Sequence, residues 1–316
     1  RALAYRSMAA PPKPPSTRAT ELGASCLTGA IVIGITNPLD TLKQRWQVEP
    51  PGANSLFAFA RGIVQQEGLL RGLWLPGVAS NICACTISVG ARLGMYPILR
   101  DALSPPAFQR SRTSMFASGL LGGALGYVAS APFFAVTRVV QARVGTLTDG
   151  RLYATGIRKG HPPIVGSQLG LSMLAHLVKE QGMLRQWQGS EVLIARGALM
   201  SATQLATYDM SKSQLKSMGL IDGPLVHCTA SLAASLTLTT AICPLDVTYT
   251  AYLAGPSLGR PFASPWAAAC ALVQEGGAKA MFRGWVPLWV RFLPSSVLTF
   301  LIYEQTRRLL LGAYLD

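Results

Sequence analysis

The chain has 316 residues, of which 50% are hydrophobic and only 13% are charged, against about 25% charged in a soluble domain. This composition argues against an ordinary soluble enzyme or binding domain and favours a membrane protein. The formal net charge is +14, but the lysines and arginines are spread over loops and ends without a basic, aromatic-rich stripe. We therefore expect no nucleic-acid partner and instead contact with anionic lipid head groups.

Residues 1–20 form a basic, proline-rich arm. Four basic residues precede the first acid, Glu21, and four prolines between positions 11 and 15 rule out a continuous helix. We interpret this segment as a mobile arm or the remnant of an import segment.

Six apolar segments are candidates to cross the membrane. Segments 72–91, 113–137 and 223–245 lack Asp, Glu, Lys and Arg over at least 20 residues, and a hydrocarbon core of about 30 Å needs about 20 residues. Shorter candidates lie at 23–39, 197–208 and 292–303. We predict an all-α membrane protein with six tilted transmembrane helices in three tandem helix-loop-helix repeats, each with a short interfacial helix such as 55–66.

A proline motif recurs three times and divides the chain. Pro38, Pro132 and Pro244 lie 94 and 112 residues apart, each inside a candidate span, where proline bends a helix. We assign repeats to residues 21–105, 106–218 and 219–316. The second contains an inserted polar loop, 144–166, rich in glycine and proline.

A second set of residues recurs in register with the glycines that begin the second helix of each repeat. These glycines are Gly77, Gly189 and Gly284. Seven positions on lie Ala84, Arg196 and Arg291, and nineteen positions on lie Tyr96, Tyr208 and Tyr303. Twenty positions on lie Pro97, Asp209 and Glu304, and twenty-three positions on lie Arg100, Lys212 and Arg307.

The chemistry-bearing residues show no catalytic or metal-binding pattern. The six cysteines lie in apolar stretches without a CxxC pair, and the three histidines lack metal-ligand spacing. No glycine-rich phosphate loop or catalytic triad pattern is present. We expect neither enzyme activity, nor a metal, nor a cofactor.

The threefold Pro-x-Asp-x-x-Lys pattern, the aromatic-x-Gly signatures and the Tyr-acid-x-x-base ends resemble the mitochondrial carrier family (solute carrier family 25) over the chain after residue 20. Segments 196–208, 297–300 and 148–152 look most similar to the 2-oxoglutarate/malate and dicarboxylate carriers. The resemblance implies a six-helix barrel in the mitochondrial inner membrane. It also implies exchange of small dicarboxylates or oxoacids through a central cavity that ion-pair networks close alternately on each side.

The resemblance assigns the substrate contacts to Arg196, Arg291, Arg92 and Ser88. A charged arginine side chain inside a membrane helix has an unfavourable free energy unless it faces a watery cavity or a partner. We therefore expect Arg196 and Arg291 to point inward. Two guanidiniums there are suited to holding a small anionic substrate by its carboxylates. The alternative is that they merely pair with acids or extend to the membrane surface.

The resemblance also implies a matrix gate made by Lys43, Asp246, Asp40, Phe134 and Tyr249. In the family, the acid of one proline-bent helix pairs with the base of the next. Here this rule leaves one ion pair, Lys43 with Asp246. It places Asp40 opposite Thr137, which cannot pair with it, and Phe134 in apolar contact with Tyr249.

The cytosolic gate is expected to have two ion pairs, Asp209 with Arg307 and Glu304 with Arg100. Lys212 lacks an acid, because Pro97 stands at the matching position.

Gly77, Gly189 and Gly284 are expected to leave backbone N–H groups free for cardiolipin phosphates, as in the family. The alternative is that these glycines only cap helices.

Two functions remain open. The first is an exchange transporter. The second is a carrier-derived structural subunit of a respiratory or ATP-synthase assembly that has lost transport. The second reading is favoured by five departures from the family pattern, at Ala84, Phe134, Thr137, Tyr249 and Pro97.

Overall fold

The computed structural model describes residues 18–48, 55–103, 112–143, 170–217 and 224–311. Within 144–169 it describes residues 145, 147, 148, 152, 153, 155, 156 and 159. Most of the basic arm expected at residues 1–20 lies outside these ranges.

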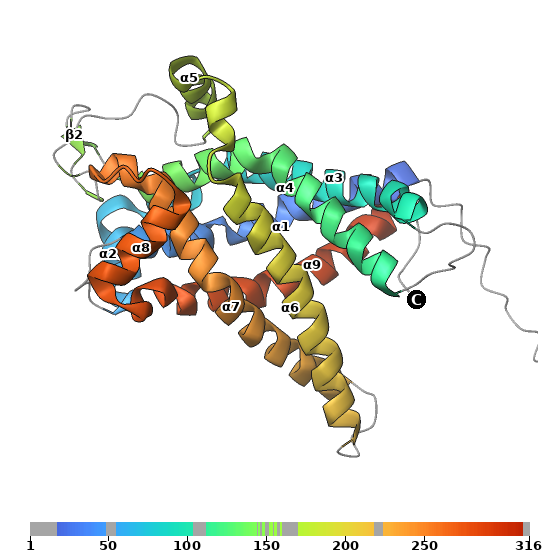
Figure 1. The fold of residues 1–316 in the computed structure, drawn as a ribbon. Coiled ribbons are helices and arrows are strands. Elements are labelled where there is room, and N and C mark those ends of the chain that lie inside the picture. Colours follow the sequence, from blue (N-terminus) through green and yellow to red (C-terminus); the bar gives the residue numbers. More distant parts are fainter. Residues whose placement is uncertain are drawn as a thin grey trace, which may run out of the picture.

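Long helices make up most of the described chain (Figure 1), and their contacts close into a ring. In chain order they are α1 (Arg18–Val48), α3 (Val78–Leu103), α4 (Arg112–Arg143), α6 (Ser190–Ser217), α7 (Pro224–Ala254) and α9 (Trp285–Leu311). Each contacts the next, and α9 returns to contact α1. This is the predicted all-α membrane architecture.

Four candidate membrane spans stand out among the described residues by length and hydropathy alone. They are Leu22–Val48, Leu70–Ala91, Leu120–Arg143 and Leu232–Ala254. The long helices α6 and α9 fall outside this set. Both carry charged residues within their length, including Arg196 and Arg291.

Short helices connect the two long helices of each repeat. They are α2 (Leu56–Glu67), α5 (Leu171–Gln181) and α8 (Pro265–Gly276). The predicted 55–66 helix is therefore present, with the Ser55 side chain accepting a hydrogen bond from the Ala58 N–H at its start. It stops at Gly68, whose φ of 78° suits glycine.

A single turn then leads into the second long helix of each repeat. These turns are η1 (Leu70–Trp74), which is π-helical, and the 3₁₀ turns η2 (Leu184–Trp187) and η4 (Ala278–Phe282). A further 3₁₀ turn, η3 (Gly255–Leu258), follows α7.

The inserted loop contains the only strands among the described residues, which the sequence did not predict. Strand β1 (Leu147–Thr148) pairs antiparallel with β2 (Leu152–Tyr153). The residues between them include Asp-Gly, a combination typical of hairpin turns. Farther along the loop, the Thr155 hydroxyl donates to Oε1 of Glu67 at 2.7 Å, so the loop of repeat 2 docks on repeat 1.

The ring is closed at one end by the three helices that carry the recurring proline motif. Pro38, Pro132 and Pro244 lie inside α1, α4 and α7, and these three helices contact one another in addition to their ring neighbours. In Figure 1 the helices gather beside α2 and α8, while the far ends of the α6–α7 and α3–α4 pairs lie apart. We call the gathered end the closed end.

Asn37 joins four segments near the closed end. This fully buried residue donates from Nδ2 to the carbonyl oxygens of Trp74 at 2.6 Å and Pro76 at 3.0 Å. Its Oδ1 accepts from Nδ2 of Asn81 and from Nε2 of Gln141, each at 3.1 Å. One amide therefore fixes α1 to the η1 turn, α3 and α4.

We expect Asn37→Ala to lower the free energy of unfolding by about 1–3 kcal/mol, because buried partners lose their hydrogen bonds. Thermal unfolding of the purified protein in detergent measures the change. Thr36→Val is the matched control, since the buried Thr36 hydroxyl donates to Val32 of its own helix at 2.8 Å. Equal losses for the two variants would contradict a joining role for Asn37.

Candidate functional site

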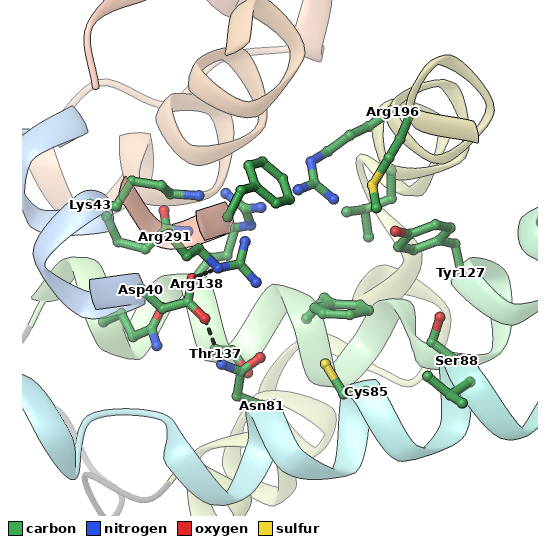
Figure 2. Close-up of a pocket in the computed structure, with 17 residues that line it drawn as sticks. Asp40, Lys43, Asn81, Cys85, Ser88, Tyr127, Thr137, Arg138, Arg196 and Arg291 are labelled. Carbon is green, nitrogen blue, oxygen red and sulfur yellow. Dashed lines mark hydrogen bonds and ion pairs between the residues drawn. The ribbon is translucent and has the colours of Figure 1, made fainter. Parts of the chain in front are cut away.

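A cavity of about 160 Å³ lies inside the ring (Figure 2). Its walls come from α1, α3, α4, α6 and α9. The charged and hydrogen-bonding residues that line it include Asp40, Lys43, Asn81, Ser88, Tyr127, Thr137, Arg138, Arg196 and Arg291. Most of these side chains point toward the cavity from different helices.

Asp246, a fully buried residue of α7, binds three cations beside this cavity. Its Oδ2 lies 2.5 Å from Nζ of Lys43, and its Oδ1 lies 2.7 Å from Nη2 of Arg138 and 3.2 Å from Nε of Arg196. The ion pair that the sequence predicts between Lys43 and Asp246 is thus formed. Its function as a gate stays a prediction.

Arg138 is a residue that the sequence analysis missed, and it corrects the expectation of a single ion pair. The family pattern places the base at Thr137, but Arg138 follows directly and its longer side chain reaches Asp246. Its Nη1 also donates to the hydroxyl of Thr250 at 2.8 Å, and its guanidinium lies 5.0 Å from the centre of the Tyr249 ring. The available signal was a base just after the uncharged span 113–137.

The expectation that Asp40 has no cationic partner is wrong. Asp40 forms an ion pair with Arg291 and accepts a hydrogen bond from Nδ2 of Asn81 at 3.3 Å. A buried carboxylate needs a cation, and Thr137 instead donates to the hydroxyl of Ser80 at 2.9 Å. Arg291 reaches Asp40 because α9 packs on α1.

Phe134 and Tyr249 belong to one apolar assembly. Phe134 packs against the buried cluster of Ala131, Val192, Leu193 and Tyr249. Its ring also pairs with that of Tyr127, with the ring centres 5.9 Å apart. The expected aromatic contribution to the closed end is therefore spread over several residues.

The structure brings three of the four predicted substrate contacts to one cavity. Arg196, Arg291 and Ser88 all line the same cavity, as the sequence predicts for the two arginines, while the side chain of Arg92 lies outside the described set. Ala84 is fully buried in α3 and contributes no charge. Both arginines also pair with acids, as the alternative interpretation expects, so their binding of substrate stays a prediction.

Tyr127 is a second lining residue that the sequence analysis did not select. Figure 2 shows it beside Arg196 and Ser88. A Cβ atom at Gly197 would lie 2.6 Å from Cδ2 of the Tyr127 ring. Glycine at position 197 therefore lets the ring lie against α6 at the cavity wall.

The charges around the cavity do not cancel. When each group is counted in its ordinary ionised form, Lys43, Arg138, Arg196 and Arg291 carry four positive charges, whereas Asp40 and Asp246 carry two negative charges. The excess is two positive charges. Such a site is suited to a small anion with two carboxylates, which guanidinium groups bind through charge-assisted hydrogen bonds.

The expected cytosolic gate lies outside the described side chains. Its members are Arg100, Asp209, Lys212, Glu304 and Arg307. Their pairing stays a prediction.

The three glycines expected to bind lipid begin α3, α6 and α9 with positive φ. The values are 65° for Gly77, 80° for Gly189 and 90° for Gly284. A Cβ atom at Gly284 would lie 2.8 Å from Cγ of Gln47. Close packing therefore explains at least this glycine, and cardiolipin binding stays a proposal.

The described residues contain no group of three His, Cys, Asp or Glu that could hold a metal ion.

Comparisons with known proteins agree with the threefold organisation. The family model described as mitochondrial carrier protein matches residues 15–106, 109–219 and 222–314. The mitochondrial dicarboxylate transporter of Saccharomyces cerevisiae is 30% identical over 283 residues, covering 89% of each chain.

Two further relatives match at similar coverage. The mitochondrial 2-oxoglutarate/malate carrier protein of Homo sapiens is 28% identical over 295 residues, covering 89% of this chain and 88% of the relative. The mitochondrial uncoupling protein 5 of Arabidopsis thaliana is 26% identical over 311 residues, covering 89% and 94%.

We expect Asp246→Asn to lower the free energy of unfolding by about 3–5 kcal/mol, because three buried cations lose their shared carboxylate. Lys43→Met should cost less, since Asp246 keeps Arg138 and Arg196. Thermal unfolding in detergent compares them. Glu275→Gln is the control, because its ion pair with Arg260 is exposed. An equal or larger loss for Lys43→Met would show that Asp246 is not the centre of the network.

Proposed function

The chain belongs to the mitochondrial carrier family, and on this premise we propose that it exchanges small dicarboxylates or oxoacids by alternating access. Members of this family are transporters and not enzymes. The protein is a multi-pass protein of the mitochondrial inner membrane.

The observation that carries the proposal is the excess of two positive charges around one cavity. Arg196 on α6 and Arg291 on α9 both line it. A fully ionised dicarboxylate entering this space would neutralise the excess, and each guanidinium can bind one carboxylate bidentately. A neutral or cationic solute would leave the excess uncompensated, so the site favours dianions.

The names of the relatives support the same class of substrate. The yeast relative is a dicarboxylate transporter and the human relative is a 2-oxoglutarate/malate carrier. Malate and 2-oxoglutarate each carry two carboxylates. We therefore propose this class for the present chain.

The proposed exchange requires the closed end to open. Opening would separate Asp246 on α7 from Lys43 on α1, from Arg138 on α4 and from Arg196 on α6. We propose that the residues of the cytosolic gate close the opposite side in turn, and that cardiolipin at the three helix-start glycines supports the barrel.

The structural-subunit alternative takes second place. It draws on five departures from the family pattern, at Ala84, Phe134, Thr137, Tyr249 and Pro97. Two cations offset the loss of the base at Thr137: Arg138 pairs with Asp246 at 2.7 Å, and Arg291 pairs with Asp40. These ion pairs weaken one of the five arguments for a non-transporting chain.

We expect liposomes that contain the purified chain and are loaded with 2-oxoglutarate to take up labelled malate. Arg291→Ala and Arg196→Ala should each lower kcat/KM by the equivalent of about 2–5 kcal/mol, because a substrate carboxylate loses a charge-assisted partner. Arg260→Ala is the control, because Arg260 is exposed and does not line the cavity.

Uptake that is indifferent to both arginines would exclude this substrate site. Absence of any exchange, together with stoichiometric recovery of the chain in a larger inner-membrane complex, would favour the structural subunit instead.

A further inference from the structure

We propose that Asp40 is an internal competitor of the substrate: it occupies Arg291 until a substrate carboxylate displaces it, and its displacement weakens the closed end. This inference rests on the proposed function, because it concerns the same cavity. It assigns to Asp40 a part in deciding how tightly the substrate binds and whether binding leads to exchange.

Arg291 is positioned to choose between two carboxylates. Its Nε contacts Oδ1 of Asp40, and both side chains line the cavity. The Arg291 side chain keeps 19% of its surface exposed, against 6% for that of Asp40. A carboxylate that enters the cavity therefore meets Arg291 from its accessible side and competes directly with Asp40.

The two acids beside the cavity would respond differently to such competition. Asp246 has three cationic partners, so it keeps Lys43 and Arg138 even if Arg196 turns to a substrate. Among the described side chains, Asp40 contacts one cation, Arg291. Its other partner there is the Asn81 amide at 3.3 Å.

Loss of Arg291 would thus leave Asp40 with one hydrogen bond and no ion pair among the described side chains. Only the more distant charges of Lys43 and Arg196 would then offset its burial, which is an unfavourable arrangement. Opening the closed end relieves it, because water then reaches Asp40. Substrate binding at Arg291 is in this way coupled to opening through Asp40. Asp246, by contrast, holds the closed end together.

The competition also makes a prediction about affinity. The lost interaction with Asp40 offsets part of the interaction between Arg291 and the substrate. The substrate therefore binds less tightly, and exchange is faster. Removing the charge of Asp40 should therefore make the substrate bind more tightly and slow its exchange.

The test uses Asp40→Asn in the full chain, reconstituted in liposomes. Asparagine keeps the size of the side chain and can still accept a hydrogen bond from Asn81. We expect KM for malate to fall by roughly tenfold and kcat to fall by at least as much, because Arg291 is free for the substrate while binding no longer destabilises the closed end. Thermal stabilisation of the detergent-purified protein by malate should shift to correspondingly lower concentrations.

Glu67→Gln is the matched control. It also removes a buried carboxylate that pairs with an arginine, Arg45, at 2.5 and 2.7 Å, but neither residue lines the cavity. KM should stay unchanged in this variant. Asp40→Glu, which keeps the competing charge, should have KM within about twofold of the wild type.

An unchanged or raised KM in Asp40→Asn, with exchange by the wild type intact, overturns the competitor role and leaves the proposed function standing. If Asp40→Asn does not fold, Asp40→Ser provides the same neutral test. Absence of malate binding and exchange in the wild type overturns both proposals.

Discussion

The structure depends on one buried carboxylate, that of Asp246. A carboxylate without partners in a water-free interior is strongly unfavourable, and so are the cations of Lys43, Arg138 and Arg196 when they lie close together without an anion. The four groups are stable only as a set, with side chains at most 8% exposed. Because the cations come from α1, α4 and α6, Asp246 on α7 ties four of the six long helices at one point.

The rest of the closed end is shaped to bring these groups together. The prolines lie inside α1, α4 and α7, and the three helices meet near them. Gly284 takes part in a less direct way: its lack of a side chain leaves room for Gln47, whose Nε2 donates to Oδ2 of Asp246 at 3.2 Å. Backbone geometry at the start of α9 thus supports the charge network through one intervening amide.

Local patterns in the sequence were sufficient for the helices, the glycine stop at Gly68 and the inward position of Arg196 and Arg291. They failed where an interaction depends on side-chain reach or on distant packing. Arg138 lies one residue beyond the position that the repeat pattern selects, and an arginine is long enough to make up this offset. The pair of Asp40 with Arg291 joins opposite ends of the chain across α1 and α9. No repeat relates these two positions, so no periodicity could reveal their contact.

The hydrogen bond from Thr155 to Glu67 breaks the pseudo-threefold symmetry of the molecule. Glu67 already anchors Arg45 within repeat 1, so a segment of repeat 2 shares the carboxylate that holds the end of α1 to the end of α2. If the three repeats rotated equally about a common axis, this hydrogen bond would be strained. Repeat 3 has no counterpart of it in the described part of the chain. This hydrogen bond therefore links repeats 1 and 2, and it makes their connection different from either repeat's connection to repeat 3.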